Sequence, residues 1–192
     1  FRDKYTVSGA TRRDGSSRLA EGNKWATFPS IGVAWRLSDE PFMQRFDFLS
    51  SAKLRSSYGV TGNTAINPYQ TQGALARTPY NFGGTTIIGF GPNQGNPPNP
   101  NLQWEKTYQT DVGAEFGFLN DRITTTADWY VQNTKDLILN RSLPATTGYT
   151  STLQNIGETK NTGLELQLST LNVRNWHGVS WSSDISWAHN KN

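Results

Sequence analysis

Cysteine is absent from this sequence, and so is any long apolar stretch. Without cysteine there is no disulfide framework, thiolate metal site or cysteine nucleophile. No apolar run approaches the roughly 20 residues that a membrane-spanning helix needs. Charge is nearly balanced, with 18 basic and 15 acidic residues spread along the chain. Such a balance argues against a nucleic-acid stripe or a polybasic membrane patch, so no nucleic-acid partner is expected.

Aromatic residues, by contrast, are abundant. They make up 12% of the chain and include seven Trp. A mildly polar, Trp-rich chain without cysteine fits either a soluble sugar-binding sandwich or a barrel with aromatic girdles. Composition alone leaves both classes open. No signal peptide follows Phe1, so we also expect the true start of the protein to be missing or removed.

The strongest pattern is the strict alternation of apolar and polar residues, which marks a strand with two unlike faces. In the segment 108–118, Val112 and Phe116 share the apolar face, whereas Asp111 and Glu115 share the polar one. Similar segments predict an all-β chain of about seven antiparallel strands, and a short helix is expected over 41–46. The expected strands are 4–11, 27–37, 51–61, 104–118, 122–133, 161–170 and 179–190.

The connections between these strands are sorted by length. They are 15, 13, 42, 3, 27 and 8 residues long, so each loop on one side exceeds the loop that follows it on the other. Long loops on one side and short turns on the other are typical of outer-membrane barrels, whose long side faces out. We therefore expect the loops 62–103 and 134–160 to be extracellular. Seven strands would leave two unpaired edges, which lipid does not tolerate, so we expect the chain to be a piece of a larger closed barrel.

Five blocks of sequence resemble the SusC/RagA family of TonB-dependent outer-membrane transporters, and they occur in the family's order. They are RRDGSSRLAEGNKWATFPSIGVAWRLSDE (12–40), LRSSYGVTGN (54–63), NPNLQWEKT (99–107), DWYVQNTKDLI (128–138) and NIGETKNTGLEL (155–166). The blocks are similar to the later part of the family's barrel.

The resemblance implies a 22-stranded barrel with an N-terminal plug, energised through the TonB complex. It also implies a SusD-like surface lipoprotein as a lid, and the import of oligosaccharides or peptides. Under this interpretation residues 1–192 form a partial barrel domain that lacks the plug and the remaining strands. The chain would be pore wall and extracellular loop, without enzymatic activity or a cofactor.

Two groups of aromatic residues are candidates for contact with other molecules. Rings near strand ends favour the membrane interface, and rings in long loops are possible contacts for a substrate or a lid protein. The expected interface aromatics are Trp25, Trp104, Tyr108, Trp176 and Trp181; the loop candidates are Tyr69, Tyr80, Phe82, Phe90 and Tyr149.

Charged residues fall on the polar face of the expected strands. They are Arg36, Lys53, Arg55, Asp111, Glu115, Asp128, Glu165 and Asp184. Two of these carboxylates could in principle serve as the acid and base of a glycoside hydrolase. A hydrated barrel interior with cross-strand charge pairs, or contacts with a plug, explains all of them better. The two histidines, His177 and His189, are too far apart for a metal site, and no catalytic or metal-binding residue is expected.

The main rival hypothesis is a secreted carbohydrate-binding β-sandwich, and a β-rich hydrolase comes third. The discriminating feature is the apolar face of the strands. A sandwich buries this face against a second sheet, whereas a barrel presents it to lipid.

Overall fold

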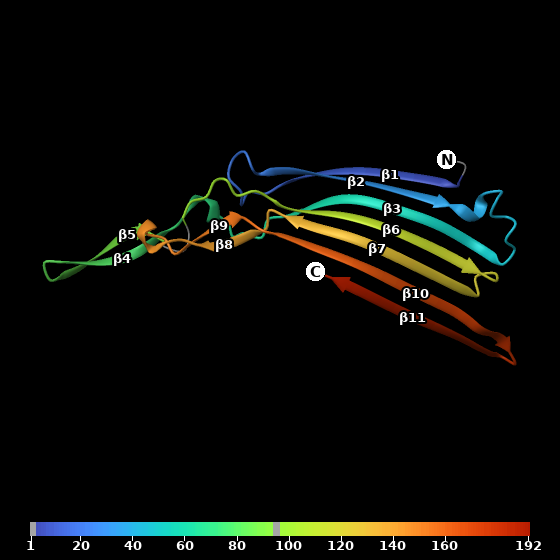
Figure 1. Cartoon of the computed structure of the whole chain (residues 1–192). Coiled ribbons are helices and arrows are strands. Elements are labelled where there is room, and N and C mark those ends of the chain that lie inside the picture. Colours follow the sequence, from blue (N-terminus) through green and yellow to red (C-terminus); the bar gives the residue numbers. More distant parts are fainter. Residues whose placement is uncertain (1–2, 94–96) are drawn as a thin grey trace.

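Seven long strands form one antiparallel sheet in the computed structural model, which describes residues 3–93 and 97–192. Phe1 lies outside the described residues. The sheet order is β1-β2-β3-β6-β7-β10-β11, so β1 and β11 are its edges (Figure 1). The strands are β1 (Tyr5–Gly15), β2 (Trp25–Arg36), β3 (Leu49–Asn63), β6 (Glu105–Phe118), β7 (Ile123–Lys135), β10 (Glu158–Trp176) and β11 (Val179–Lys191). The expected all-β chain of seven antiparallel strands is confirmed.

The short connections at one end of the sheet are tight turns. Between β6 and β7, Leu119, Asn120 and Asp121 all have positive φ angles of 55° to 59°, and Phe118 pairs directly with Ile123. The short connection expected between these two antiparallel strands is therefore confirmed. Strand β10 is longer than expected, so only residues 177–178 separate it from β11. We refer to this end as the turn end and to the opposite end as the loop end.

The long loops contain regular structure that the sequence analysis missed. Within 64–104, strands β4 (Leu75–Phe82) and β5 (Thr85–Pro92) form a hairpin, preceded by the short 3-10 helix η2 (Gln70–Gln72). Within 136–157, β8 (Ile138–Ser142) and β9 (Ser151–Asn155) form a second hairpin around η3 (Ala145–Thr147). Figure 1 shows that the β4–β5 hairpin projects away from the main sheet.

Two local expectations were wrong. The first loop at the loop end, 16–24, is shorter than the 37–48 loop that follows it at the turn end, because β1 and β2 extend beyond the expected limits. The sorting by length holds for the other two pairs. Instead of a helix over 41–46, the chain forms the 3-10 helix η1 (Leu37–Asp39) and then successive turns, closed by bonds such as Met43 N–H to Glu40 O. Among the described residues, no helix has the length and apolar character to cross a membrane.

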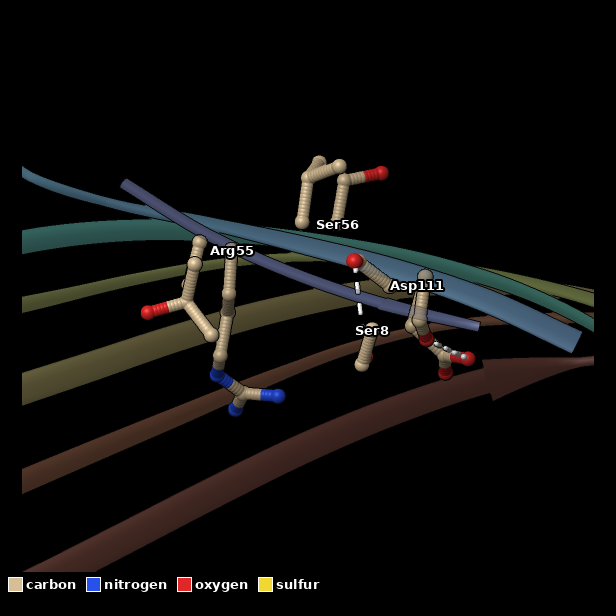
Figure 2. A pocket seen from close by; sticks show the side chains of 9 residues that line it. Ser8, Arg55, Ser56 and Asp111 are labelled. Carbon is tan, nitrogen blue, oxygen red and sulfur yellow. Dashed lines mark hydrogen bonds between the residues drawn. The ribbon is translucent and has the colours of Figure 1, made fainter. Parts of the chain in front are cut away.

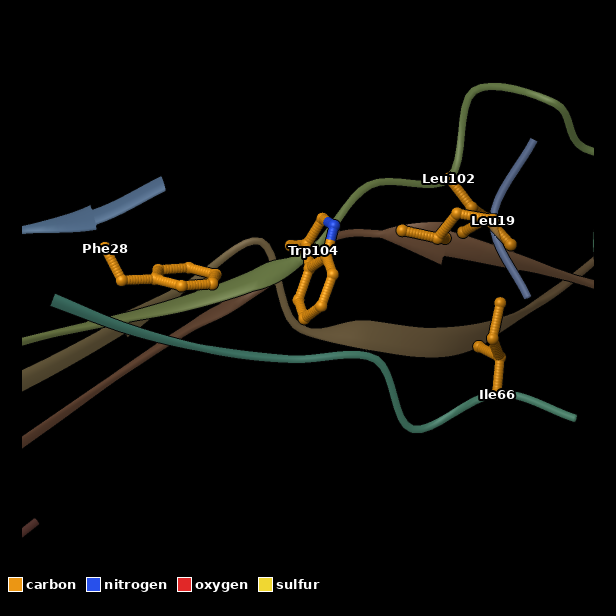
Figure 3. Close-up of a cluster of buried hydrophobic side chains, with 5 residues drawn as sticks. All are labelled: Leu19, Phe28, Ile66, Leu102 and Trp104. Atoms are coloured by element: carbon orange, nitrogen blue, oxygen red, sulfur yellow. The ribbon is translucent and has the colours of Figure 1, made fainter. Parts of the chain in front are cut away.

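The two faces of the sheet differ, and a cluster of buried apolar side chains lies at the loop end. Large apolar side chains on one face of the sheet are widely exposed, as at Val112, Trp129 and Leu166. No second sheet packs on them within the described part of the chain. The buried apolar side chains at the loop end form one cluster, which we call the loop-end cluster (Figure 3): Leu19, Phe28, Ile66, Leu102 and Trp104. This cluster holds the long loops against the ends of the strands.

Candidate functional site

The polar face of the sheet is built around an arginine that reaches across a whole strand. The Arg55 Nη2 atom on β3 donates to both carboxylate oxygens of Asp128 on β7, at 2.6 and 2.7 Å. Strand β6 lies between β3 and β7, and its residue at the crossing is Gly113, the register partner of both Arg55 and Asp128. A Cβ on Gly113 would lie only 2.8 Å from Arg55 Nε. The glycine therefore gives the guanidinium its path over β6.

A second carboxylate joins this ion pair. Glu115 Oε1 lies 3.1 Å from Arg55 Nε and 3.4 Å from Lys53 Nζ. The Arg55 contact is electrostatic and lacks the alignment of a hydrogen bond. Two cations from β3 thus share two carboxylates from β6 and β7. All four side chains retain considerable solvent exposure, so we assign this network a role in orientation and assign it no large contribution to stability.

The remaining predicted charges on the polar face are placed differently. Arg36 pairs locally with Asp39, at 3.5 Å. Asp111 accepts hydrogen bonds from Ser57 and from Gln109. Glu165 stands directly across from Asp128, as its register partner on β10.

Charge on the polar face is also segregated. Asp184 on β11 pairs in register with Ser169 on β10. The alternation places no Lys or Arg at the polar-face positions of β6, β7, β10 and β11, whereas Arg36, Lys53 and Arg55 all lie on β2 and β3. The polar face therefore changes from cationic to anionic across the sheet.

Shallow hollows lie along this face. One of them has a volume of about 190 Å³. Figure 2 shows its lining residues Ser8, Arg55 and Asp111 on the same side of the ribbons and Ser56 on the other. A neighbouring hollow of about 380 Å³ is lined by side chains from four strands, including Gln132 and Glu165. Among the described residues, no group of His, Asp or Glu side chains has the arrangement that a metal ion needs. The surface can orient polar solutes and water.

This pattern of a polar face, an apolar face and sorted loops matches a known family along its whole length. The model of the TonB-dependent receptor-like β-barrel family matches residues 1–192. The chain belongs to this family. Its members are proteins of the bacterial outer membrane, so the exposed apolar face of the sheet is a lipid-facing surface. The sandwich hypothesis is accordingly not favoured.

Individual relatives support the same assignment. The chain is 40% identical over 192 residues to TonB-dependent receptor P26 of Formosa agariphila, covering all of this chain and 19% of that protein. It is 34% identical over 199 residues to TonB-dependent receptor SusC of Bacteroides thetaiotaomicron, covering 98% of this chain and 19% of that protein. The RagAB peptide importer in its open-open state matches with a TM-score of 0.84 at 30% identity, over 99% of this chain and 20% of that one. The chain thus spans about a fifth of the length of its relatives.

In this receptor segment, four of the five expected interface aromatics lie near the two ends of the lipid-facing surface. Trp25 and Tyr108 lie toward the loop end, and Trp176 and Trp181 lie at the turn end. The three tryptophans are 59% to 69% exposed. Their contact with the membrane interface stays a prediction.

Trp104 differs from the prediction. Its ring is only 8% exposed and packs edge-on against Phe28, with ring centroids 5.5 Å apart. Its indole N–H donates to the Lys24 carbonyl. The ring belongs to the loop-end cluster (Figure 3), where the folded loops cover it and exclude contact with lipid.

The loop aromatics are not brought together. Tyr80 and Phe82 share one face of the β4–β5 hairpin, and Phe90 lies on the other face, opposite Arg77. All three rings are more than half exposed. Tyr69 is 75% exposed, beside a hollow of about 350 Å³ that is also lined by residues of the 16–24 loop.

The fifth loop candidate lies in a different part of the receptor segment. Tyr149 belongs to the loop between β8 and β9 and is half-buried. Among the described residues no ring contact joins it to the β4–β5 rings, so a role in binding a substrate or a lid stays a prediction for all five.

Sequence reasoning missed a carboxylate that organises the turn end. Glu40 accepts hydrogen bonds from the Tyr5 hydroxyl at 2.7 Å, from the Trp35 indole at 3.2 Å and from Lys4 at 3.3 Å. The Tyr5 bond first, and then those from Trp35 and Lys4, hold the pKa of this half-buried carboxyl below its ordinary value. Glu40 thereby ties the 37–48 loop to β1 and β2. No alternation pattern could have indicated this, because the partners come from two strands and a loop.

Proposed function

We propose that residues 1–192 form part of the wall and the extracellular vestibule of an outer-membrane, TonB-dependent importer of the SusC type. The observation that carries the proposal is a single sheet with two chemically opposite faces. One face exposes apolar rows such as Leu164, Leu166 and Leu168, which suit lipid. The other face exposes the ion-pair network of Arg55, which suits a hydrated interior.

In this importer the sheet and its polar face have different roles. The sheet supplies a rigid wall, because every one of its strands is paired with a neighbour along most of its length. The polar face offers hydroxyls, amides and charges to a hydrated solute, and transport requires no covalent bond to be made or broken. The segment would therefore act without enzymatic activity. The missing part of the barrel and a plug that couples to the TonB complex would lie outside these residues.

The loops would form the entrance of the importer. The loop-end cluster fixes the base of both long loops, and the β4–β5 hairpin extends beyond it with exposed rings. Exposed aromatic and apolar side chains of this kind favour contact with a partner or ligand. We propose a SusD-like surface lipoprotein as that partner and an oligosaccharide or a peptide as the imported nutrient. The support is similarity to a receptor named SusC and to the RagAB peptide importer.

The wall proposal can be tested by comparing neighbouring residues of one strand in the full receptor. Residues 1–192 contain no cysteine, so a single cysteine introduced here gives an unambiguous label in a background without accessible thiols. Thr126→Cys lies on the polar face, and Ala127→Cys lies on the lipid face of β7. We expect a water-soluble thiol reagent to modify the first and spare the second in folded outer membranes. Equal reactivity at both positions would contradict the two-faced wall.

Stability gives a second measure of the same contrast. Ala127→Arg places a charge near the middle of the lipid-facing surface, and it should destabilise the receptor by roughly 2–4 kcal/mol. Thr126→Arg faces the hydrated side and should cost less. Unfolding by denaturant in lipid vesicles measures both values.

Transport itself is tested by uptake in cells. Cells that lack the receptor gene should fail to take up one member of a panel of labelled oligosaccharides and peptides, and the intact gene should restore that uptake. A receptor whose loss changes the uptake of no panel member would argue against the importer function while leaving the wall architecture intact.

A further inference from the structure

The lipid-facing side of the sheet carries a row of lysines at its loop end. Four strands that are consecutive in the sheet (Figure 1) each contribute one: Lys106 on β6, Lys135 on β7, Lys160 on β10 and Lys191 on β11. We call these four residues the lysine belt. Three of its side chains are exposed, and Lys106 is half-buried.

The alternation fixes the side to which the belt belongs. Lys106 lies six positions before Val112, and Lys135 lies six positions after Trp129. Because alternate residues of a strand share a face, each lysine lies on the lipid-facing side of its strand. The belt therefore continues the apolar surface toward the loop end. Long cationic side chains in such positions extend their charged groups from the edge of the hydrocarbon region into the headgroup layer.

Within the belt, like charges face one another directly. Lys106 and Lys135 are register partners on neighbouring strands, an arrangement that is destabilising for two charges of the same sign. Glu158 is the register partner of Lys135 on the other side. In the described part of the chain, however, neither this carboxylate nor any other lies within ion-pair distance of the belt lysines. Four lysines beside one carboxylate thus leave this end of the four strands net positive.

An unsatisfied acceptor lies among the same residues. Asn133 pairs in register with Tyr108 on one side and with Lys160 on the other. Its side-chain oxygen is buried and has no hydrogen-bond partner. A buried acceptor without a donor is uncommon in folded proteins.

The turn end of the same four strands carries fewer such charges. Its lipid-facing positions hold residues such as Phe118, Ile123, Leu168 and Trp181, and the cation on these strands at this end is Arg174, where the register of β10 shifts. The lipid-facing surface is therefore more cationic at the loop end than at the turn end. In a membrane whose two leaflets carry different headgroups, the two ends of this surface would therefore contact different headgroups.

We propose that the lysine belt binds the phosphate groups of lipid headgroups in the leaflet at the loop end of the barrel. Lipid is the favoured occupant because the belt is continuous with the apolar surface and faces the same way. Phosphate fits because it is a multivalent anion that can lie between two ammonium groups and cancel the opposition of Lys106 and Lys135. The binding would also fix which end of the barrel faces the phosphate-bearing leaflet, independently of loop length.

The first experiment measures lipid binding to the full receptor in nonionic detergent by native mass spectrometry. The probes are lipid A with two phosphates and the same lipid after removal of its phosphates. We expect the wild type to retain the phosphorylated probe preferentially. Lys106→Ala/Lys135→Ala/Lys160→Ala should weaken that retention roughly tenfold or more, and added salt should weaken it further.

A matched control removes the same number of charges elsewhere. Arg45→Ala/Arg77→Ala/Arg174→Ala changes three exposed cations that lie outside the belt, and it should bind the phosphorylated probe like the wild type. Equal loss in both triple variants, or equal retention of the dephosphorylated probe, would overturn the proposal. Displacement of the lipid by an equal concentration of inorganic phosphate would also overturn it, since the belt would then recognise free phosphate.

A charge reversal keeps the proposal testable if the triple variant fails to fold. Lys106→Glu places a carboxylate opposite Lys135, which should raise the melting temperature in phosphate-free detergent while lowering the retention of phosphorylated lipid A. A purely structural role for Lys106 would move both quantities in the same direction. That outcome would contradict lipid binding.

Discussion

The two ends of the sheet are stabilised by different means. At the loop end, five buried apolar side chains pack beneath the long loops, with Leu102 only 1% exposed. At the turn end, tight turns join the strands, and the Phe48 and Phe118 rings stack 6.2 Å apart while remaining partly exposed. The middle of the sheet leaves its apolar face to lipid. A barrel wall therefore needs a core of its own only where loops extend beyond the membrane.

The largest difference between the two ends should be in how readily an added protease cleaves them. On intact cells that carry the full receptor, added protease should cut within the β4–β5 hairpin, residues 75–92, and spare the turn 119–122, because the longer loops of such barrels are extracellular. Mapping the cleaved peptides by mass spectrometry gives the result. Cutting at 119–122 with protection of the hairpin would invert the proposed sidedness.

Removal of one side chain from the loop-end cluster should have the next largest effect. Leu102→Ala leaves a cavity and should cost about 2–5 kcal/mol of unfolding free energy. Phe46→Ala at the turn end removes a ring that is already 47% exposed, and it should cost no more than about 1 kcal/mol. Denaturant unfolding of the two variants in vesicles compares them. Similar losses would mean that the turn end is packed as tightly as the loop end.

Two glycines of β3 offer a finer comparison. A Cβ at Gly62 would meet the Phe28 ring and lie 3.1 Å from the Trp104 ring, whereas a Cβ at Gly59 would have its nearest contact at 3.6 Å. Gly62→Ala should therefore cost about 1–3 kcal/mol through overpacking, and Gly59→Ala should stay within about 0.5 kcal/mol. Melting curves of both variants test this. If Gly59→Ala is the more harmful change, the fit of Phe28 over β3 is not what stabilises this region.

The smallest effect concerns Glu40 at the turn end. Its pKa is lower in the folded protein than its ordinary value, so folding is favoured while the carboxyl is ionised. This contribution is complete above the ordinary pKa and is lost as the pH falls through the lowered value. We expect Glu40→Gln to remove a slight acid-induced decrease in melting temperature. An unchanged pH profile would show that the bonds from Tyr5 and Trp35 do not depend on ionisation.

Most of the sheet, but little of the loop end, could be predicted from the sequence. A period of two places Val112 and Asp111 on opposite faces without any knowledge of the neighbouring strands. The β4–β5 hairpin was missed although Gly83 and Gly84, both with positive φ angles, supply a two-residue turn signal. The burial of Trp104 could not be predicted, because it depends on how three separate loops pack. The Arg55–Asp128 pair also required the register of two successive ladders.

That pair has a consequence for the comparison of related sequences. Arg55 and Asp128 lie on strands that are not neighbours, and Gly113 on the strand between them keeps the crossing open. Substitutions at the three positions should therefore be correlated during evolution. Taken alone, the covariation of Arg55 and Asp128 would indicate that β3 and β7 are neighbours. Including Gly113 as the third member of the set accounts for the strand that lies between them.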